Sequence, residues 1–158
     1  MNQPTMHINE FGSLLAMPGY QIYEYQLILV LPEVLKEKIR KQKQQFYTRF
    51  NLPQAATAGI FLPLVKFRQR QLLEQKVRFA LNQLITGWRP FPVNLKDYGF
   101  QPTHSVYIPV TSRNKLQEAV KSLRTINHLL KLDKDQTAFY PADHQVTIAS
   151  RLRPGVYE

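Results

Sequence analysis

The segment YEYQLILVL, residues 23–31, restricts the fold of this chain more than any other feature. Polar and apolar residues alternate over its first half, and its second half is apolar throughout. Alternation is typical of a strand with one side in water, whereas an unbroken apolar run is typical of a strand buried on both faces. The segment therefore predicts a strand that enters the buried part of a sheet.

A long amphipathic helix is predicted directly after this strand. Pro32 stands where the first turn of a helix tolerates proline, because the amide hydrogen that proline lacks would have no helical partner there. Apolar residues then recur at helical spacing at Leu35, Ile39, Phe46 and Phe50. A second helix is predicted to end near Gly87, a residue typical of helix C-termini. Its apolar stripe consists of Leu73, Val77, Ala80 and Leu84.

The segment IFLPLVKF, residues 60–67, predicts another strand, apolar on both faces. Regular alternation would place Ile60, Leu62 and Leu64 on one face. The opposite face would then hold Phe61, Pro63, Val65 and Phe67.

The second half of the chain predicts a hairpin, a third helix and a last strand. Residues 91–98 and 104–110 alternate and would pair across a turn. The helix would begin at Ser112 or Asn114 as its cap and bury Leu116, Val120, Leu123, Ile126 and Leu130. A polar connector, residues 133–143, precedes the strand at residues 146–150. This order of elements predicts an α+β fold with helices packed on the faces of sheets.

Length and composition favour one compact domain. The chain has 158 residues, of which 44% are hydrophobic, which is enough for a core of ordinary size. Residues 1–22 are polar and rich in turn formers, and we expect a flexible arm there, followed by a single domain over residues 23–158. Without a signal-peptide pattern or a run of about 18 apolar residues, we expect a cytoplasmic protein that does not contact membranes. The absence of cysteine excludes disulfides and thiol chemistry.

The charge balance favours a phosphate-bearing partner. Lys and Arg number 21 against 11 Asp and Glu, a net charge of +10, which indicates either an RNA or nucleotide partner or a basic solvated surface. The first helix carries a set of cations that either tracks phosphates or is a solvated face: Lys36, Lys38, Arg40, Lys41 and Lys43. Cations also lie where the strands at 60–67 and 146–150 end, and they either meet an anionic ligand or belong to exposed exit loops: Lys66, Arg68, Arg70, Arg151 and Arg153.

Five segments carry a family resemblance, in this order: YEYQLILVLPEVLKEKI, GIFLPLVKF, VNLKDYGFQPTHSVYIPV, VKSLRTINHLLKL and HQVTIASRLRPGVYE. They span nearly the whole chain after residue 22 and together resemble the two-histidine phosphoesterase superfamily, specifically its bacterial 2′-5′ RNA ligase-like and cyclic phosphodiesterase-like members. The resemblance implies two pseudo-symmetric lobes of antiparallel sheet, with helices packed outside, around a central cleft.

Each lobe of that family contributes a strand with the motif His-x-Thr or His-x-Ser. Residues i and i+2 of a strand face the same way, so an imidazole and a hydroxyl reach one phosphate in the cleft. One histidine takes a proton from the attacking hydroxyl or water, and the other protonates the leaving oxygen. The resemblance thus implies 2′,3′-cyclic phosphodiesterase or 2′-5′ RNA ligase chemistry where both histidines are present.

This chain departs from the motif at three of its four positions. Alignment by resemblance places Phe61 and Pro63 at the first histidine and hydroxyl positions. Gln145 and Thr147 stand at the second pair, so Thr147 alone keeps its type. Since neither a benzyl ring nor a carboxamide transfers protons at neutral pH, the sequence predicts a degenerate site.

His144 leaves an alternative open. In a regular strand its side chain faces away from Gln145 and Thr147 and stays outside the cleft. A β-bulge at this point would turn His144 into line with Thr147. Residual phosphodiesterase or ligase activity through His144 is therefore the competing hypothesis.

The remaining candidates have weaker signals. His104 would either line the cleft or end a strand, and Trp88 would either stack a base or belong to the core. His7 and His128 have no partners at metal-ligand spacing, and no phosphate-binding loop or nucleophile motif occurs, so we expect no metal ion and no cofactor.

The leading hypothesis is a monomeric, non-catalytic homologue that binds RNA ends or a nucleotide phosphate in the cleft. Gln145 and Thr147 would supply polar contacts, and Phe61 an apolar stacking surface. Positive charge would come from Lys66, Arg68 and Arg151. In a third hypothesis the protein is a structural or interaction protein whose cleft is filled by Phe61 and Pro63.

Overall fold

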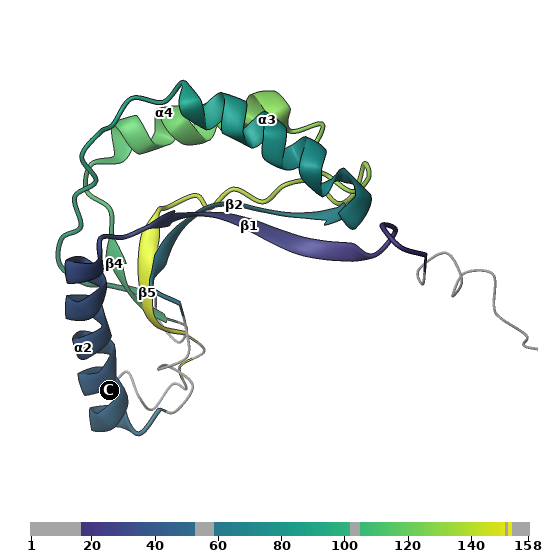
Figure 1. Ribbon diagram of the computed structural model, residues 1–158. Helices are drawn as coiled ribbons and strands as arrows, with labels where there is room; N and C mark the ends of the chain where they lie inside the picture. Colours follow the sequence, from purple (N-terminus) through teal and green to yellow (C-terminus); the bar gives the residue numbers. More distant parts are fainter. Residues whose placement is uncertain (1–16, 53–58, 102–104, 151, 153–158) are drawn as a thin grey trace, which may run out of the picture.

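A computed structural model of the chain describes residues 17–52, 59–101, 105–150 and Leu152 (Figure 1). The elements are, in chain order, β1 (Ile22–Val30), α2 (Glu33–Phe50), β2 (Phe61–Arg70), α3 (Glu74–Thr86), β3 (Gly99–Gln101), β4 (Ser105–Pro109), α4 (Arg113–Leu123) and β5 (Gln145–Ser150). One 3-10 turn precedes α3 at Gln71–Leu73, and another follows α4 at Arg124–Ile126. Helices combined with antiparallel sheets confirm the predicted α+β class.

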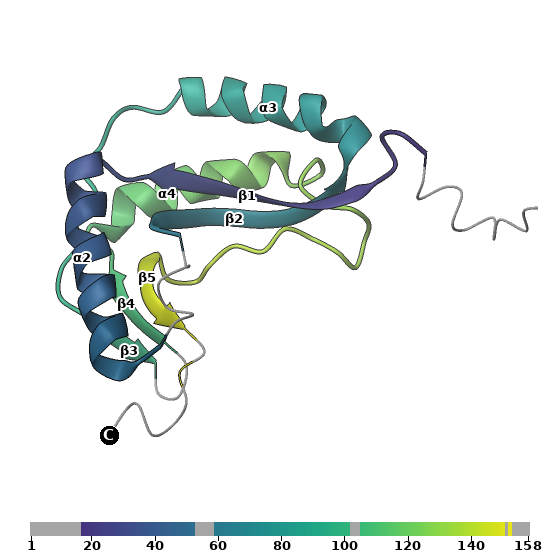
Figure 2. The ribbon, with the colours of Figure 1, turned by 60° about the horizontal axis from the view of Figure 1, so that its bottom comes forward.

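The described strands form two small antiparallel sheets. β1 pairs with β2, and β4 lies between β3 and β5. Helices α3 and α4 lie on one face of the β1–β2 sheet, and α2 lies beside the three-stranded sheet (Figures 1 and 2). β2 and β5 are in contact where the two sheets meet. The face of each sheet turned away from these helices is named its inner face.

Most of the apolar stripe predicted for the third helix anchors the core. Leu116, Leu123 and Leu130 have no exposed surface, and Val120 is buried beside them. The regular helix ends earlier than predicted, at Leu123, so Ile126 lies in a 3-10 turn and is half-buried, and Leu130 lies beyond that turn. Ser112 is the N-cap residue, but its hydroxyl accepts a hydrogen bond from the amide of Asn94 at 2.8 Å and makes no hydrogen bond to α4. Ser112 therefore connects the start of α4 to the segment that contains Asn94.

A β-bulge interrupts the alternation of side chains along β2. Val65 lies opposite Leu27 of β1, whereas Pro63 already lies opposite Ile28. Leu64 is thus an extra residue in β2, and a bulge of this kind lets two consecutive side chains point to the same side.

The bulge overturns part of the predicted orientation of this strand. Val65 and Phe67 do not share a face with Phe61 and Pro63, because the phase of the alternation changes at Leu64. The buried side of β2 consists of Leu62, Leu64, Val65, Phe67 and Gln69. Its inner face consists of Phe61, Pro63, Lys66, Arg68 and Arg70. The strand also extends to Arg70, so these three cations belong to the strand and not to an exit loop.

The last strand contains a second bulge. Ala149 lies opposite Val106 of β4, and Thr147 already lies opposite Tyr107. Ile148 is therefore the extra residue of β5. Burial again follows the bulge, since Ile148 and Ala149 are both buried although they are consecutive.

The predicted strand at residues 91–98 is wrong, because the regular partner of β4 begins at Gly99, where the sequence pattern indicates the turn. β4 pairs with β3, Gly99–Gln101, while residues 91–98 contribute one isolated bridge, from Leu95 to Val110. Asp97 has a left-handed backbone with φ of 60°, which interrupts the extended conformation between the two pairings. The last residues before β4, including His104, lie outside the described residues.

The connector at residues 133–143 runs along the free edge of β2. Phe139 and Lys66 exchange two backbone hydrogen bonds, of 2.7 and 2.9 Å. Nearby, the amide Nε2 of Gln69 donates to the carbonyl oxygens of Leu129 and Lys131 at 3.0 and 2.9 Å. These hydrogen bonds fix the position of the connector along β2. The sequence pattern identifies this segment as polar but does not give its position.

Residues 17–21 pair with the chain just after β2. The amide of Leu72 donates to the carbonyl of Gly19 at 2.8 Å, and that of Gln71 to the carbonyl of Gln21 at 2.9 Å. Gly19 has φ of 87°, a conformation that favours glycine. The rest of the predicted N-terminal arm, residues 1–16, lies outside the described residues.

Replacing Gln69 should destabilise the attachment of the connector. Gln69 is 4% exposed, and Gln69→Ala leaves two carbonyl oxygens without their donor. We expect the free energy of unfolding to fall by about 1–3 kcal/mol, measured by urea denaturation. Gln75→Ala, at an exposed position of α3, is the control and should change little. Equal stability of the two variants would contradict this role.

Candidate functional site

The position that the resemblance assigns to the first motif lies at the start of β2. Phe61 and Pro63 are both half-buried on the inner face. The ring of Phe61 lies over Gly59, where an added Cβ would be 2.3 Å from the ring atom Cε1. Glycine at this position therefore allows the ring to rest on the backbone. The ring offers an apolar surface and no group that transfers a proton.

The position that the resemblance assigns to the second motif lies on β5. Gln145 and Thr147 are half-buried and point to the inner face of the three-stranded sheet. Thr147 stands directly opposite Tyr107 of β4, so their side chains are neighbours. The ring of Tyr107 lies over Gly99, whose added Cβ would be 2.2 Å from the ring atom Cε2. This inner face thus offers a hydroxyl, a carboxamide and a phenol.

His144 points the other way and connects the two sheets. It is 9% exposed, and its Nδ1 lies 3.3 Å from the carbonyl oxygen of Pro63. Since a carbonyl only accepts, Nδ1 must carry the hydrogen in this contact. The bulge of β5 falls at Ile148, so it does not turn His144 towards Thr147. The imidazole is a buried link between β2 and β5.

This position predicts a structural effect of His144→Ala and no catalytic one. Losing the contact to Pro63 should lower the free energy of unfolding by about 1–3 kcal/mol in urea denaturation. The exposed His128 gives a matched control, and His128→Ala should be neutral. Any release of product from 2′,3′-cyclic nucleotides above a protein-free control that disappears in His144→Ala would contradict the structural role.

The cations of β2 lie on the same face as Phe61 and Pro63. Lys66 Nζ is 2.8 Å from a carboxylate oxygen of Glu24 on β1, and both side chains are about half exposed. Arg68 Nη1 donates to the side-chain oxygen of Gln136 at 3.3 Å. The partners hold both cations in place on the inner face. Arg151 and Arg153, the other predicted cations, lie outside the described residues.

Phe139 is a candidate that sequence reasoning missed. It belongs to the connector, 73 positions after Lys66, and the backbone pairing brings the two together. Its side chain is 64% exposed. The available signal was the pattern Ala-Phe-Tyr-Pro in an otherwise polar segment, which is weak by itself.

The cations of α2 do not form the uniformly solvated face that the pattern suggested. Lys43 is 3% exposed, whereas Lys38 and Lys41 are exposed. Lys36 and Arg40 border a hollow of about 570 Å³ together with Lys43. Both of these outer cations pair with Glu33, at 3.3 and 3.6 Å. Arg40 also pairs with Glu37, so carboxylates are paired with two of the three cations that border this hollow.

Burial lowers the pKa of Lys43 below its ordinary value of 10.5. The unfolded chain then holds that proton more tightly, so the free energy of unfolding should rise with pH between the lowered pKa and 10.5. Urea denaturation across this window should show the rise in the wild type and in Lys41→Met. Lys43→Met should lack it, and an unchanged pH dependence would contradict the assignment.

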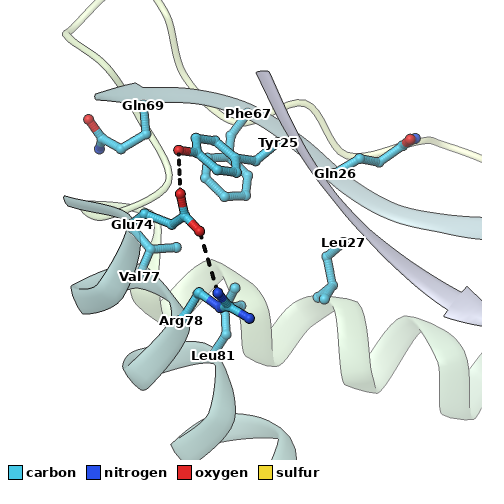
Figure 3. A pocket seen from close by; sticks show the side chains of 9 residues that line it. All are labelled: Tyr25, Gln26, Leu27, Phe67, Gln69, Glu74, Val77, Arg78 and Leu81. Atoms are coloured by element: carbon cyan, nitrogen blue, oxygen red, sulfur yellow. Dashed lines mark hydrogen bonds and ion pairs between the residues drawn. The ribbon is translucent and has the colours of Figure 1, made fainter. Parts of the chain in front are cut away.

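A smaller hollow, of about 190 Å³, lies between β1, β2 and α3 on the helix-covered side (Figure 3). Tyr25 is stacked on Phe67 with ring centroids 5.4 Å apart, and its hydroxyl donates to Glu74 at 3.2 Å. Burial, and then the charge of Glu74, raise the pKa of Tyr25. Glu74 also pairs with Arg78 at 3.5 Å. These groups satisfy one another and connect β1 to α3, so we assign them no ligand.

Trp88 belongs to the packing between helices. It is half-buried after α3, and its indole Nε1 donates to the hydroxyl of Ser122 on α4 at 3.0 Å. This contact supports the core interpretation over base stacking.

Within residues 17–52, 59–101, 105–150 and Leu152, no group of three His, Cys, Asp or Glu side chains could hold a metal ion. In the same part of the chain, no helix has both the length and the apolar composition needed to cross a bilayer. Comparison of the chain with family models, curated proteins and solved structures found no match. The family resemblance of the sequence therefore stays a prediction.

Proposed function

We propose that this chain is a degenerate member of the two-histidine phosphoesterase superfamily, of the 2′-5′ RNA ligase-like type. In this proposal the two sheets are the cores of pseudo-symmetric lobes, and a cleft lies between their inner faces. The cleft binds an RNA end or a nucleotide phosphate and does not cleave it. The monomeric state and the cytoplasmic location expected from the sequence are part of the same proposal.

The observation that carries the proposal is the repeated bulge in β2 and β5. The extra residues Leu64 and Ile148 are separated by 84 positions, as are the motif positions Phe61 and Gln145. The exposure of the side chains follows the same order over residues 61–66 of β2 and residues 145–150 of β5. Half-buried and buried side chains alternate over the first three residues, two buried ones follow, and the sixth residue is exposed. An irregularity repeated at one spacing supports a duplicated strand that carries the motif in each lobe.

The residues at the motif positions favour binding over catalysis. General acid–base catalysis needs a group that gains and loses a proton, and none of Phe61, Pro63 and Gln145 does so. Thr147 and the Gln145 carboxamide can donate hydrogen bonds to phosphate oxygens. Lys66 and Arg68 add positive charge on the neighbouring inner face, and Arg151 is assigned the same role from the sequence.

The competing hypotheses make different use of the same residues. Residual phosphodiesterase or ligase activity requires His144 in the cleft, whereas its imidazole contacts the carbonyl of Pro63. In a structural or interaction protein, the side chains of Phe61 and Pro63 would fill the cleft. The resting of the Phe61 ring on Gly59 is compatible with this last hypothesis as well as with a stacking surface.

Binding of terminally phosphorylated RNA should depend on salt and on the inner-face cations. We expect the double variant Lys66→Ala/Arg68→Ala to bind a labelled, 3′-phosphorylated RNA more weakly in fluorescence anisotropy. The dependence of log Kd on log salt should become shallower by about 0.7 for each phosphate contact removed. Thr147→Val should weaken binding by about two- to tenfold for phosphorylated RNA only.

The control is Lys76→Ala/Arg78→Ala, which removes the same charge from exposed positions of α3 on the opposite side of the sheet. It should bind RNA almost like the wild type. Absence of RNA and nucleotide binding at low salt would eliminate the proposed function and favour an interaction protein.

A further inference from the structure

Phe139 presents an exposed aromatic ring on the inner face of the β1–β2 sheet. Its amide donates to the carbonyl of Lys66 at 2.7 Å, and the amide of Lys66 donates back at 2.9 Å. Residues that exchange both bonds in an antiparallel pair stand directly opposite, and their side chains point to the same face. Lys66 is on the inner face, so the Phe139 ring stands beside it there.

The neighbours of Phe139 hold the ring in this orientation. Ala138 and Tyr140 on either side are half-buried and pack against the core. The hydroxyl of Tyr140 donates to the side-chain oxygen of Asn127, and the Arg124 guanidinium lies 4.4 Å from the centre of the Tyr140 ring. With the flanking side chains turned inward, the alternation of an extended segment directs Phe139 outward.

A row of cations starts beside this ring. Lys66, Arg68 and Arg70 occupy alternate positions of β2, all exposed. Alternate residues of a strand are about 6.7 Å apart, which is close to the spacing of successive phosphates in an extended single strand. On β1, Glu24 is the acidic residue opposite this row, so the side chains that β1 and β2 place on this face carry a net positive charge.

The row also has a direction. It begins near Pro63, where β2 meets β5, and leads away from the paired motif positions towards the end of β2 at Arg70. A strand of RNA whose terminal phosphate lies between β2 and β5 would therefore continue along Lys66, Arg68 and Arg70.

Exposure alone does not distinguish Phe139, since single exposed apolar side chains are common. Phe79 on α3 has the same exposed fraction, 64%, and it lies on the helical layer. The distinguishing feature is the combination of an exposed ring with adjacent cations at strand spacing. Proteins that bind single-stranded nucleic acid combine a positively charged groove with aromatic side chains that stack on bases.

We propose that the inner face of the β1–β2 sheet binds single-stranded RNA several nucleotides long, with a base stacked on Phe139 and phosphates at Lys66, Arg68 and Arg70. This inference rests on the proposed function, and it deepens it by specifying an oligonucleotide in place of a mononucleotide. The carboxylate of Glu24 pairs with Lys66 and repels phosphates, so it lowers the affinity of this face for RNA.

The test compares a six-nucleotide RNA bearing a 3′-phosphate with a nucleoside 3′-monophosphate, using the purified full chain. We expect the wild type to bind the longer ligand at least tenfold more tightly. Phe139→Ala should weaken binding of the longer RNA by roughly tenfold, the usual effect of losing one stacked base, and leave the mononucleotide unaffected. Phe139→Tyr should bind like the wild type, and Phe79→Ala is the matched control.

Three further variants report on stacking and charge. In Phe139→Trp, the longer RNA should quench tryptophan fluorescence beyond any change of Trp88 in the wild type, a signal that a merely structural role of residue 139 would not produce. Glu24→Gln should tighten binding of the longer RNA a fewfold, whereas Arg70→Ala should make its salt dependence shallower by about 0.7.

The outcomes separate the two proposals. Mononucleotide binding without a gain from the longer RNA would overturn this inference and leave the proposed function intact. Phe139→Ala binding the longer RNA as tightly as the wild type does, at an unchanged melting temperature, would also overturn it. Failure of both ligands to bind at low salt would overturn the proposed function and this inference together.

Discussion

The extra residue Leu64 in β2 determines which side chains meet the helices and which face outward. Leu64 is 1% exposed and Val65 is fully buried, so both consecutive side chains enter the core. From Lys66 onward every second residue is a cation on the inner face. Without the bulge, the alternation would direct Lys66 and Arg68 under the helices, where removing their charges from water would cost several kcal/mol each.

The same device in β5 gives the second sheet a comparable inner face. Ile148 and Ala149 are buried, while Thr147 stays half-buried opposite Tyr107. Both inner faces also place an aromatic ring over a glycine, Phe61 over Gly59 and Tyr107 over Gly99. A ring resting on backbone loses little freedom when a ligand binds, which favours these surfaces for contact with planar groups.

The helical part of the fold was predictable because periodicity and end signals agree there. The stripe of α4 and the end of α3 at Gly87 follow directly from spacing and from glycine at a helix terminus. Each bulge is visible in the sequence as two adjacent apolar residues between two alternating runs of opposite phase. A prediction that assumes regular alternation along the whole strand overlooks this signal. Lys43 was misassigned because helical spacing alone does not reveal which flank of α2 lies against other segments.

The sequence by itself determined the α+β class, the positions of the helices and the absence of proton-transferring side chains at Phe61, Pro63 and Gln145, because these depend on local pattern and on residue chemistry. Only the tertiary structure decided the burial of His144 against Pro63, the face occupied by the β2 cations and the place of Phe139 beside Lys66. Those features depend on strand register and on backbone hydrogen bonds between distant segments. A change of one residue in register reverses every side chain, and no short sequence pattern specifies it.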